Sequence, residues 1–350
     1  MRNIIFVAGG TGGHLYPAMN LADYIMNNSR DINIIFIGRK NGIESKLLKD
    51  KFPFYGISLP RAIELRPWDY IKAFYEVEKI IRKLKPDLFV IFGSYISVPV
   101  LINAVFWRYP FYMHEQNVIP GKVIKYFSPL AKGIAISFPE TKKFLKNKNI
   151  FYTGNFVRKE QLTIDKESCK KELGFNLNKK LLLITGGSQG ARKINEIVKK
   201  IIPILLDMNW EIFHQIGENL FSEYIKDIPE EWMFKGYRPT PFINEMEKAI
   251  RASDLAISRA GATTIYQFLY AGLPAIYIPY PYAKDNHQYL NAKIAVEKGF
   301  GTIIKESDLS ESVLIEKIVE WGDKKVKPLN LPDGREIFWG ILKDYLEGRN

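Results

Sequence analysis

The sequence predicts an α/β protein built from two doubly wound, parallel-sheet domains of the Rossmann type that face each other across a cleft. Short β-rich apolar runs alternate with amphipathic stretches, which is typical of parallel sheets covered by helices. The pattern of strand, glycine turn and helix that opens the chain at Gly9 recurs at Gly186, 177 residues later. The length of 350 residues also exceeds what one hydrophobic core comfortably serves, so two domains are expected.

Each expected strand is a short apolar run that is followed, in most cases, by a glycine turn or a helical pattern. In the first half these runs cover residues 3–8, 32–37, 88–92, 111–114 and 133–136. In the second half they cover residues 181–185, 211–216, 233–236, 255–258 and 274–278. A linker is expected near residues 156–166, which gives domains of residues 1–158 and 159–333. The amphipathic segment 336–346 predicts a final helix, within about residues 334–350, that packs back on the first domain.

Residues 88–107 form an uncharged stretch of twenty residues, long enough in principle to span a bilayer. Glycine, serine, proline and asparagine interrupt it, so a buried strand, a glycine turn and a helix over residues 98–107 explain it better. The apolar run 4–8 is too short for the core of a signal peptide, so no export signal is expected. Cys169 is the single cysteine, which excludes an internal disulfide and favours a reducing compartment.

The net charge of +12 is confined to the first half of the chain. Residues 1–158 contain 23 Lys and Arg against 11 Asp and Glu, whereas residues 159–350 contain 27 of each kind. Charge that served solubility alone would not be divided in this way. A one-sided basic domain predicts a polyanionic partner, which could be a nucleic acid, an anionic membrane surface or a phosphorylated acceptor.

A basic amphipathic stretch over residues 61–85 suits an anionic membrane surface. Lys and Arg are interleaved with apolar side chains, among which are Trp68, Ile71, Phe74 and Tyr75. Exposed aromatic and basic side chains together are typical of a peripheral helix at a membrane interface. The alternative is a helix that buries the same apolar face in the protein core.

The first glycine turn, residues 9–14, stands between an expected strand and an expected helix. Glycines let the backbone approach a ligand closely, and the amides at the start of the helix can bind an anion; the alternative is a purely structural turn. The turn is neither a Walker loop nor a G-x-G-x-x-G motif, because Leu15 occupies the last glycine's place. His14 ends the turn, where an imidazole could remove a proton from an attacking hydroxyl or, alternatively, only bond the backbone.

Two turns and one polar loop follow expected strands of the second half, at residues 186–192, 258–264 and 285–288. Each alone could be an ordinary surface loop. Because the carboxyl ends of parallel strands share one edge of a sheet, together they predict a nucleotide-sugar pocket. No Asp-x-Asp ends a strand, and four His and one Cys form no zinc motif, so no metal or other cofactor is expected. Backbone amides and helix dipoles would then have to stabilise a leaving diphosphate.

With these motifs in order, the chain resembles the MurG family over nearly its whole length. The motifs that carry the resemblance are Gly9 to His14, Gly93 to Ser97, His114 to Asn117, Thr153 to Asn155, Gly186 to Arg192, His214-Gln215, Gly261-Ala262, Ala271 to Pro274 and Asp285 to Gln288. The resemblance implies the GT-B fold and an inverting, metal-independent N-acetylglucosaminyltransferase of peptidoglycan synthesis. It implies UDP-N-acetylglucosamine as donor on the second domain and undecaprenyl-diphospho-muramoyl-pentapeptide as acceptor on the first. The enzyme would be peripheral at the cytoplasmic face of the cell membrane, with no nucleic-acid partner.

The resemblance assigns roles to the residues at the matching motif positions. His14 looks like the family's catalytic base or a close helper of that base. The residues implied to contact UDP-N-acetylglucosamine are Thr11, Gly12, Gly13, Asn117, Arg158, Ser188, Arg192, Ile243, Gln267, His287 and Gln288. Those implied to hold the acceptor's diphosphate are Gly10, Gly13, Gly93, Ser94 and Tyr95. Within these sets, the resemblance implies that Arg158, Ser188 and Arg192 lie near the diphosphate of the donor. It also implies that the backbone of Ile243 reads uracil and that Gln288 contacts the sugar hydroxyls.

The chain departs from the family pattern at Gln267, where the family usually has a glutamate that grips the ribose hydroxyls. Val98-Pro99 stands in place of Gly-Pro in the second glycine loop, and Phe156 stands where a proline is usual. Three rival functions are a related transferase with another lipid acceptor such as diacylglycerol, a UDP-sugar epimerase on the same scaffold, and a binding protein for nucleic acid or lipid. The epimerase would need acidic residues around the sugar, and the loops are poor in Asp and Glu.

Overall fold

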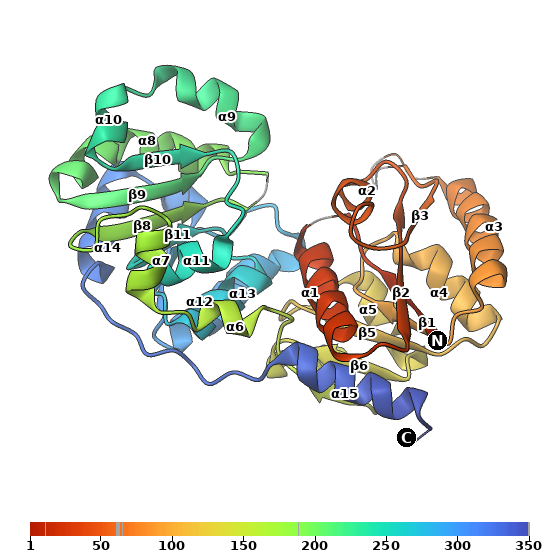
Figure 1. Ribbon diagram of the computed structural model, residues 1–350. Helices are drawn as coiled ribbons and strands as arrows, with labels where there is room; N and C mark the ends of the chain where they lie inside the picture. Colours follow the sequence, from red (N-terminus) through yellow and green to blue (C-terminus); the bar gives the residue numbers. More distant parts are fainter. Residues whose placement is uncertain (11, 61–63, 65, 188, 349–350) are drawn as a thin grey trace. The chain divides into compact units, whose positions relative to one another are not determined.

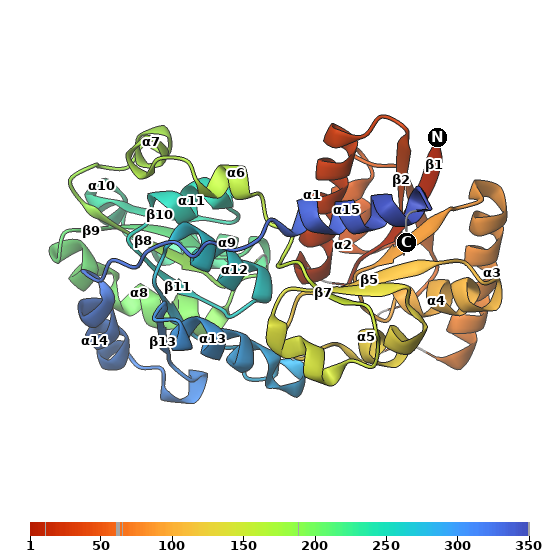
Figure 2. The ribbon, with the colours of Figure 1, turned by 90° about the horizontal axis from the view of Figure 1, so that it is seen from below.

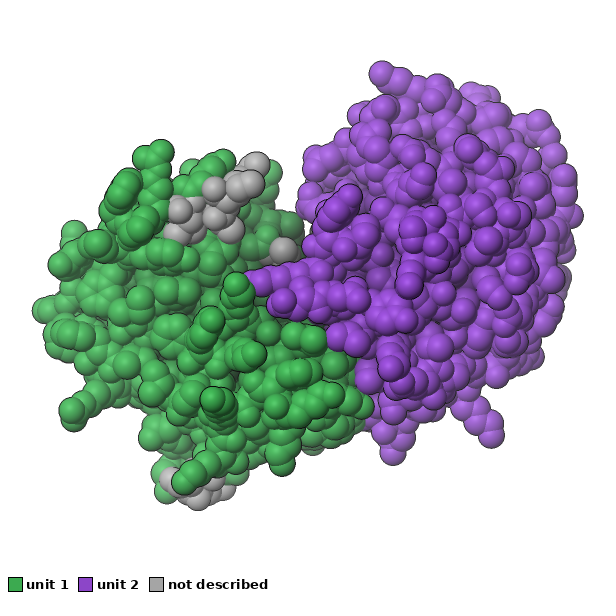
Figure 3. Space-filling view, turned by 180° about the vertical axis from the view of Figure 1, so that it is seen from behind, with its two compact units in different colours: residues 1–157, 332–350 green, residues 158–331 purple. Residues whose placement is uncertain are grey.

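The computed structural model describes residues 1–350 apart from residues 11, 61–63, 65, 188 and 349–350. The chain divides into two compact units, which Figure 3 colours separately. Unit 1 comprises residues 1–157 and 332–350, and unit 2 comprises residues 158–331. Each unit contains one parallel sheet flanked by helices (Figure 1), so the prediction of two doubly wound, Rossmann-like domains is confirmed.

Unit 1 is built on a seven-stranded sheet in the order β3-β2-β1-β4-β5-β6-β7, and its neighbouring strands are all parallel. The strands are β1 (Arg2–Val7), β2 (Ile32–Arg39), β3 (Phe54–Ile57), β4 (Leu88–Ile91), β5 (Phe111–Glu115), β6 (Gly133–Ile136) and β7 (Ile150–Tyr152). Successive side chains of a strand point to opposite faces, so along β1 Ile4 and Phe6 enter one core cluster and Ile5 and Val7 enter the other. Such strands are apolar throughout because helices cover both faces.

The helices of unit 1 form two layers. One face of the sheet is covered by α1 (Gly12–Asn28) and α15 (Gly334–Leu346), which lie side by side in Figures 1 and 2. The other face is covered by α3 (Pro67–Leu84), α4 (Ser97–Phe106) and α5 (Lys122–Phe127), and the short α2 (Ile43–Leu48) packs beside β2 and β3. Phe338, Trp339 and Leu342 of α15 are buried in the same cluster as Phe6. The end of the chain therefore completes the core of unit 1.

Gly334 begins α15 where the returning chain meets the segment that leaves unit 1. A Cβ atom at Gly334 would lie 2.8 Å from the carbonyl oxygens of both Gly154 and Asn155. Only glycine allows so close an approach. The segments by which the chain leaves and re-enters unit 1 thus run directly against each other.

Unit 2 is built on a six-stranded sheet in the order β10-β9-β8-β11-β12-β13, again all parallel. The strands are β8 (Lys180–Thr185), β9 (Trp210–Gln215), β10 (Tyr237–Thr240), β11 (Leu255–Ser258), β12 (Ala275–Tyr277) and β13 (Gly301–Ile303). The helices are α6 (Lys159–Leu162), α7 (Lys166–Glu172), α8 (Arg192–Asp207), α9 (Glu218–Tyr224), α10 (Glu230–Lys235), α11 (Met246–Ala252), α12 (Ala262–Ala271), α13 (His287–Glu297) and α14 (Glu311–Trp321). The largest core cluster packs α8 and α14 against β8, β9 and β11.

Most of the strands expected from the sequence are confirmed, and one prediction is wrong. Residues 233–236 are not a strand, because they close helix α10, which ends at Gly236 with φ of 118°. The true strand β10 follows directly, and β3, β7 and β13 were not predicted. Residues 88–107 form β4, a glycine turn and α4 as expected, and none of the described helices is both long and apolar enough to cross a membrane.

Candidate active site

Each sheet has one position where the strand order reverses, and ligands of doubly wound sheets bind outside the carboxyl ends of the strands at such positions. In unit 1 the reversal lies between β1 and β4, whose following loops contain residues 8–10 and 92–96. In unit 2 it lies between β8 and β11, whose following loops contain residues 186–187, 189–191 and 259–261. The glycine motifs seen in the sequence therefore occupy both reversal positions.

His14 and the two glycine loops of unit 1 meet at the first of these positions. A Cβ atom at Gly93 would lie 3.3 Å from Cδ2 and Nε2 of His14, so the imidazole lies against the backbone of Gly93. A Cβ atom at Gly10 would lie 2.8 Å from Oγ of Ser94. Gly10, Gly93 and Ser94 all have positive φ, at 84°, 94° and 70°. The left-handed conformation is rare for serine, and this strain marks the Gly93–Ser94 turn as a functional candidate.

A buried polar group supports Asn117 at the end of β5. Oε1 of Glu115 accepts hydrogen bonds from the amide of Asn117 at 2.9 Å and from its Nδ2 at 3.2 Å, while Oε2 accepts from the amide of Gly121 at 2.8 Å. Burial raises the pKa of the Glu115 carboxyl to about 7, although the hydrogen bonds oppose this shift. Asn117 is therefore fixed in orientation by a side chain that the sequence did not single out.

His114 is the other histidine of unit 1, and its surroundings keep it neutral. Its ring stacks on Phe156 at 4.0 Å and its Nε2 lies 3.2 Å from Oγ of Ser137. Burial, helped by the charge of nearby His14, lowers the pKa of His114 to about 3. Phe156, at the position where the resemblance implies a proline, thus provides the stacking surface for this imidazole.

Gln215 joins two loops of unit 2 that were each predicted to contact the nucleotide. This side chain is 1% exposed at the end of β9. Its Nε2 donates to the carbonyl of Gly187 at 2.9 Å, and its Oε1 accepts from the amide of Ile243 at 3.0 Å. The amide of Ile243 is therefore already bonded in this structure.

His214, the neighbour of Gln215, anchors the opposite side of the same strand end. Nδ2 of Asn195 donates to the carbonyl of Ile216 at 3.0 Å, which leaves its Oδ1 to accept from Nε2 of His214 at 3.1 Å. Nδ1 of His214 lies 3.0 Å from the hydroxyl oxygen of Tyr237, which in turn donates to the hydroxyl of Tyr224 at 2.9 Å. Burial lowers the pKa of His214 to about 3, so the imidazole is neutral. These hydrogen bonds join α8 to the end of β9 and to the loop that follows it.

Gln288 and His287 open helix α13 with defined hydrogen bonds. Oε1 of Gln288 accepts from the amide of Tyr280 at 2.9 Å and from that of Ala260 at 3.3 Å. Its Nε2 is therefore the part of the amide that can donate to a sugar hydroxyl. Nδ1 of His287 lies 2.8 Å from the carbonyl of Lys284 and must donate to it, so Nε2 is its acceptor. Asp285 and Asn286 precede them with φ of 53° and 52°, a strained pair that turns the loop.

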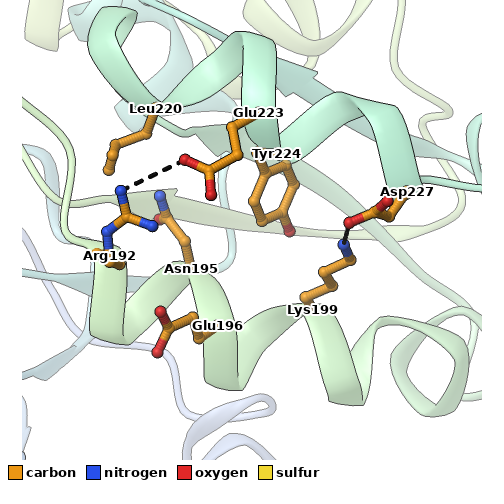
Figure 4. Close-up of a pocket in the computed structure, with 8 residues that line it drawn as sticks. All are labelled: Arg192, Asn195, Glu196, Lys199, Leu220, Glu223, Tyr224 and Asp227. Atoms are coloured by element: carbon orange, nitrogen blue, oxygen red, sulfur yellow. Dashed lines mark hydrogen bonds and ion pairs between the residues drawn. The ribbon is translucent and has the colours of Figure 1, made fainter.

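The two arginines that the resemblance places near the diphosphate are paired with carboxylates in this structure. Nε and Nη2 of Arg158 bond Oε1 and Oε2 of buried Glu247 at 3.1 and 3.3 Å. Nη2 of Arg192, the first residue of α8, lies 3.4 Å from Oε2 of Glu223. Figure 4 shows this pair at a surface pocket that α8 and α9 line, where both side chains are largely exposed. An exposed pair of this kind is weak and can open for an anionic ligand.

The other predicted residues are placed as follows. Gln267 is 9% exposed on α12, two turns after Gly261. Gly12 and Gly13 form the first residues of α1, and Tyr95 follows Ser94 in the second loop of unit 1. Thr11 and Ser188 lie outside the described residues. Among the described residues, no group of three His, Cys, Asp or Glu side chains could hold a metal ion.

An apolar surface lies on helices α3 and α4 of unit 1. Trp68, Ile71 and Tyr75 are 58–60% exposed, and Phe74 is partly covered by an edge contact with Phe106 at 6.3 Å. The sequence prediction covered only α3, but α4 and the residue that caps its end contribute four more exposed side chains. These are Ile102, Val105, Phe106 and Trp107. We call the eight residues the α3–α4 surface. Their exposure excludes the alternative that this face of α3 is simply core.

Comparison with known proteins gives the same assignment to both halves of the chain. Residues 4–136 match the glycosyltransferase family 28 N-terminal domain, and residues 181–335 match the glycosyltransferase family 28 C-terminal domain. A protein of Halothermothrix orenii is 34% identical over an alignment of 370 positions. The alignment covers 99% of this chain and 99% of the relative. One of Caldanaerobacter subterraneus subsp. tengcongensis is 34% identical over 325 residues, or 90% of this chain and 89% of the relative. Both are named UDP-N-acetylglucosamine--N-acetylmuramyl-(pentapeptide) pyrophosphoryl-undecaprenol N-acetylglucosamine transferase.

A solved structure agrees with the sequence relatives. The crystal structure of Acinetobacter baumannii MurG matches with a TM-score of 0.72 at 26% identity, and the match covers 98% of this chain and 100% of that one. The fold is therefore GT-B, as the resemblance implied. With family models over both units and relatives identical at one residue in three along nearly its whole length, the chain belongs to the MurG family of N-acetylglucosaminyltransferases within glycosyltransferase family 28.

Proposed function

We propose that the enzyme transfers N-acetylglucosamine from UDP-N-acetylglucosamine to an undecaprenyl-pyrophosphoryl N-acetylmuramyl-pentapeptide. These are the substrates in the names of its relatives. The observation that carries the proposal is the position of His14 against Gly93, where the strand order of unit 1 reverses. Unit 1 would bind the acceptor and unit 2 the donor.

His14 would act as the general base. It would accept the proton of the acceptor hydroxyl as that oxygen forms a bond to the anomeric carbon. The bond from this carbon to the diphosphate oxygen breaks on the opposite side, so the configuration inverts and UDP leaves. The only base in this scheme is the imidazole, and general bases of this kind contribute about 100-fold to 10,000-fold in rate.

The leaving diphosphate would be stabilised without a divalent ion. The loop that ends at Ala191 leads directly into helix α8, whose amide end can bind an anion. Arg192 and Arg158 would exchange their carboxylate partners for phosphate oxygens. Gln215 holds the loop by the Gly187 carbonyl and the uracil-binding segment at Ile243, so both ends of the nucleotide would be positioned by one amide.

The α3–α4 surface would hold the enzyme at the cytoplasmic face of the cell membrane, where a lipid-linked acceptor is found. Exposed Lys72, Lys79 and Arg82 on α3 are basic neighbours of the exposed aromatic side chains. Aromatic side chains enter the interfacial region of a bilayer, and basic ones attract anionic headgroups.

Transfer of labelled N-acetylglucosamine decides between acceptors. The muramoyl-pentapeptide diphospholipid should be glycosylated, and diacylglycerol should not. The reaction should continue in excess chelator. Preferential labelling of diacylglycerol would reject the acceptor assignment, and activity that chelator abolishes and magnesium restores would reject the metal-free leaving-group site.

A further inference from the structure

Arg39 ends strand β2 beside the two glycine loops of unit 1. Its Nη1 lies 3.5 Å from the hydroxyl of Tyr95, and its buried Nε has no hydrogen-bond partner among the described residues. Tyr95 directs its own hydroxyl proton to the carbonyl of Pro60 at 3.0 Å. The guanidinium is therefore held by one long hydrogen bond, and an unpaired buried donor favours any arrangement that supplies it with an acceptor.

A buried carboxylate lies behind the first glycine loop. Glu44 is fully buried on α2, and its Oε1 accepts from the amide of Arg39 at 2.9 Å. Three glycines make room for it, since Cβ atoms at Gly9, Gly38 and Gly42 would lie 2.4–2.7 Å from its side chain. Its Oε2 has no hydrogen-bond partner among the described residues.

Backbone amides give the glycine loop only partial positive charge. The acidic side chain directly behind Gly9, Glu44, adds no positive charge to it. A diphosphate at the loop is therefore bound more tightly where a full positive charge lies nearby. Arg39 is joined to this site at both ends, by its amide to Glu44 and by its guanidinium to Tyr95.

We propose that Arg39 binds the diphosphate of the lipid-linked acceptor, together with the loops of Gly10 and Ser94. This inference rests on the proposed function, because it assumes that unit 1 takes a diphosphate-linked acceptor. Guanidinium presents two parallel N–H groups that match phosphate oxygens, and a lysine ammonium does not. Tyr95 holds the guanidinium on the loop side of β2 until the acceptor arrives.

The test compares Arg39→Gln with Lys40→Gln. Lys40 is the next residue and is exposed, so the two variants lose the same charge from neighbouring positions. Arg39→Gln should raise the KM for the muramoyl-pentapeptide diphospholipid by about tenfold or more and raise the inhibition constant of inorganic pyrophosphate against that acceptor. Arg39→Lys should recover part of the loss. The KM for UDP-N-acetylglucosamine and the thermal unfolding midpoint should not change.

The outcomes separate the two proposals. An acceptor KM for Arg39→Gln within twofold of that for Lys40→Gln would overturn the role of Arg39 while leaving the transferase assignment intact. A rise in the donor KM of equal size would also overturn it, because the residue would then act on the nucleotide site or on the fold. If the parent enzyme transfers no N-acetylglucosamine to this lipid, the proposed function itself fails.

Discussion

His14 lies against the backbone of Gly93 and is the general base of the proposed mechanism. His14→Ala should lower turnover by about a hundredfold or more, the usual contribution of a positioned base. UDP binds to the other unit in this scheme, so its affinity should stay the same. Steady-state kinetics with titration of UDP measure both, and turnover near that of the parent, with the chemical step limiting, would remove His14 from the mechanism.

Gln267 is the position where the family resemblance implies a glutamate that grips the ribose hydroxyls. A carboxylate there accepts charge-assisted hydrogen bonds from ribose hydroxyls, each about twice as strong as a neutral one, whereas an amide has one acceptor oxygen. Gln267→Glu should therefore tighten UDP binding and Gln267→Ala should weaken it, as calorimetric titration can measure. The side chain is 9% exposed, so thermal unfolding must show that the glutamate variant folds normally. A folded glutamate variant that binds UDP no better than the parent would reject the ribose contact.

Sequence patterns reveal site residues of one kind and hide those of another. Glycine turns and the histidine after them are visible because few residues tolerate such backbone geometry or carry such chemistry. Gln215 belongs to a motif of the family resemblance but was not predicted as a site residue, because its role depends on Gly187 and Ile243, which are each 28 residues away. Glu44 was not predicted either, although its partner Arg39 is only five residues away. No periodicity signals a buried polar side chain that joins two loops.

At the scale of single elements, the errors concern short strands at or near sheet edges. Strand β10 is an edge strand with the sequence Tyr-Arg-Pro-Thr, and proline is tolerated there because an edge needs no second set of amide bonds. The apolar residues just before it, Met233 and Phe234, suggested the strand but belong to α10. Strands β3, β7 and β13 are also edge strands of three or four residues, too short to show a pattern.

The pair of helices α3 and α4 supports a prediction about membranes. The parent should co-sediment with anionic vesicles more than with neutral ones, and binding should fall with salt, since each engaged Lys or Arg contributes about 1 kcal/mol and is screened. The double variant Trp68→Ala, Phe106→Ala should bind anionic vesicles more weakly than the parent does, because both rings are at least 60% exposed. Phe234→Ala removes an 87% exposed ring on α10 of unit 2 and is the matched control.

Two results would contradict this account of the α3–α4 surface. Equal binding to neutral and anionic vesicles would remove its electrostatic part. An equal loss of binding in Phe234→Ala would show that exposed aromatic area in general, and not this surface, drives the association.

For the molecule as a whole, buried neutral histidines predict acid sensitivity. The pKa of His214 is lowered from 6.5 to about 3 by burial. Between these pH values the imidazole is protonated in the unfolded chain but stays neutral in the folded protein. Stability from this residue is complete above pH 6.5 and falls by about 1.4 kcal/mol per pH unit on acidification towards pH 3. The free energy of unfolding of unit 2 should therefore drop by about 2 kcal/mol from this source between pH 6.5 and pH 5.

Urea unfolding at pH 7 and pH 5 checks this prediction against the variant His214→Asn. The asparagine cannot take up a proton, so the variant should lose about 2 kcal/mol less than the parent on acidification, whatever its stability at pH 7. Identical pH dependence in both proteins would show that His214 is not the cause.

Unit 2 is one continuous segment of the chain, whereas unit 1 is finished only by residues 332–350. Ribosomes release a chain from its N-terminus, and the first domain ordinarily folds first. Here unit 1 cannot be completed first, because Phe338, Trp339 and Leu342, which belong to the same core cluster as Phe6, follow the whole of unit 2 along the chain. The second unit has its complete sequence while the first still lacks a helix, so a chain interrupted before α15 carries a finished unit joined to one whose apolar face is open to water.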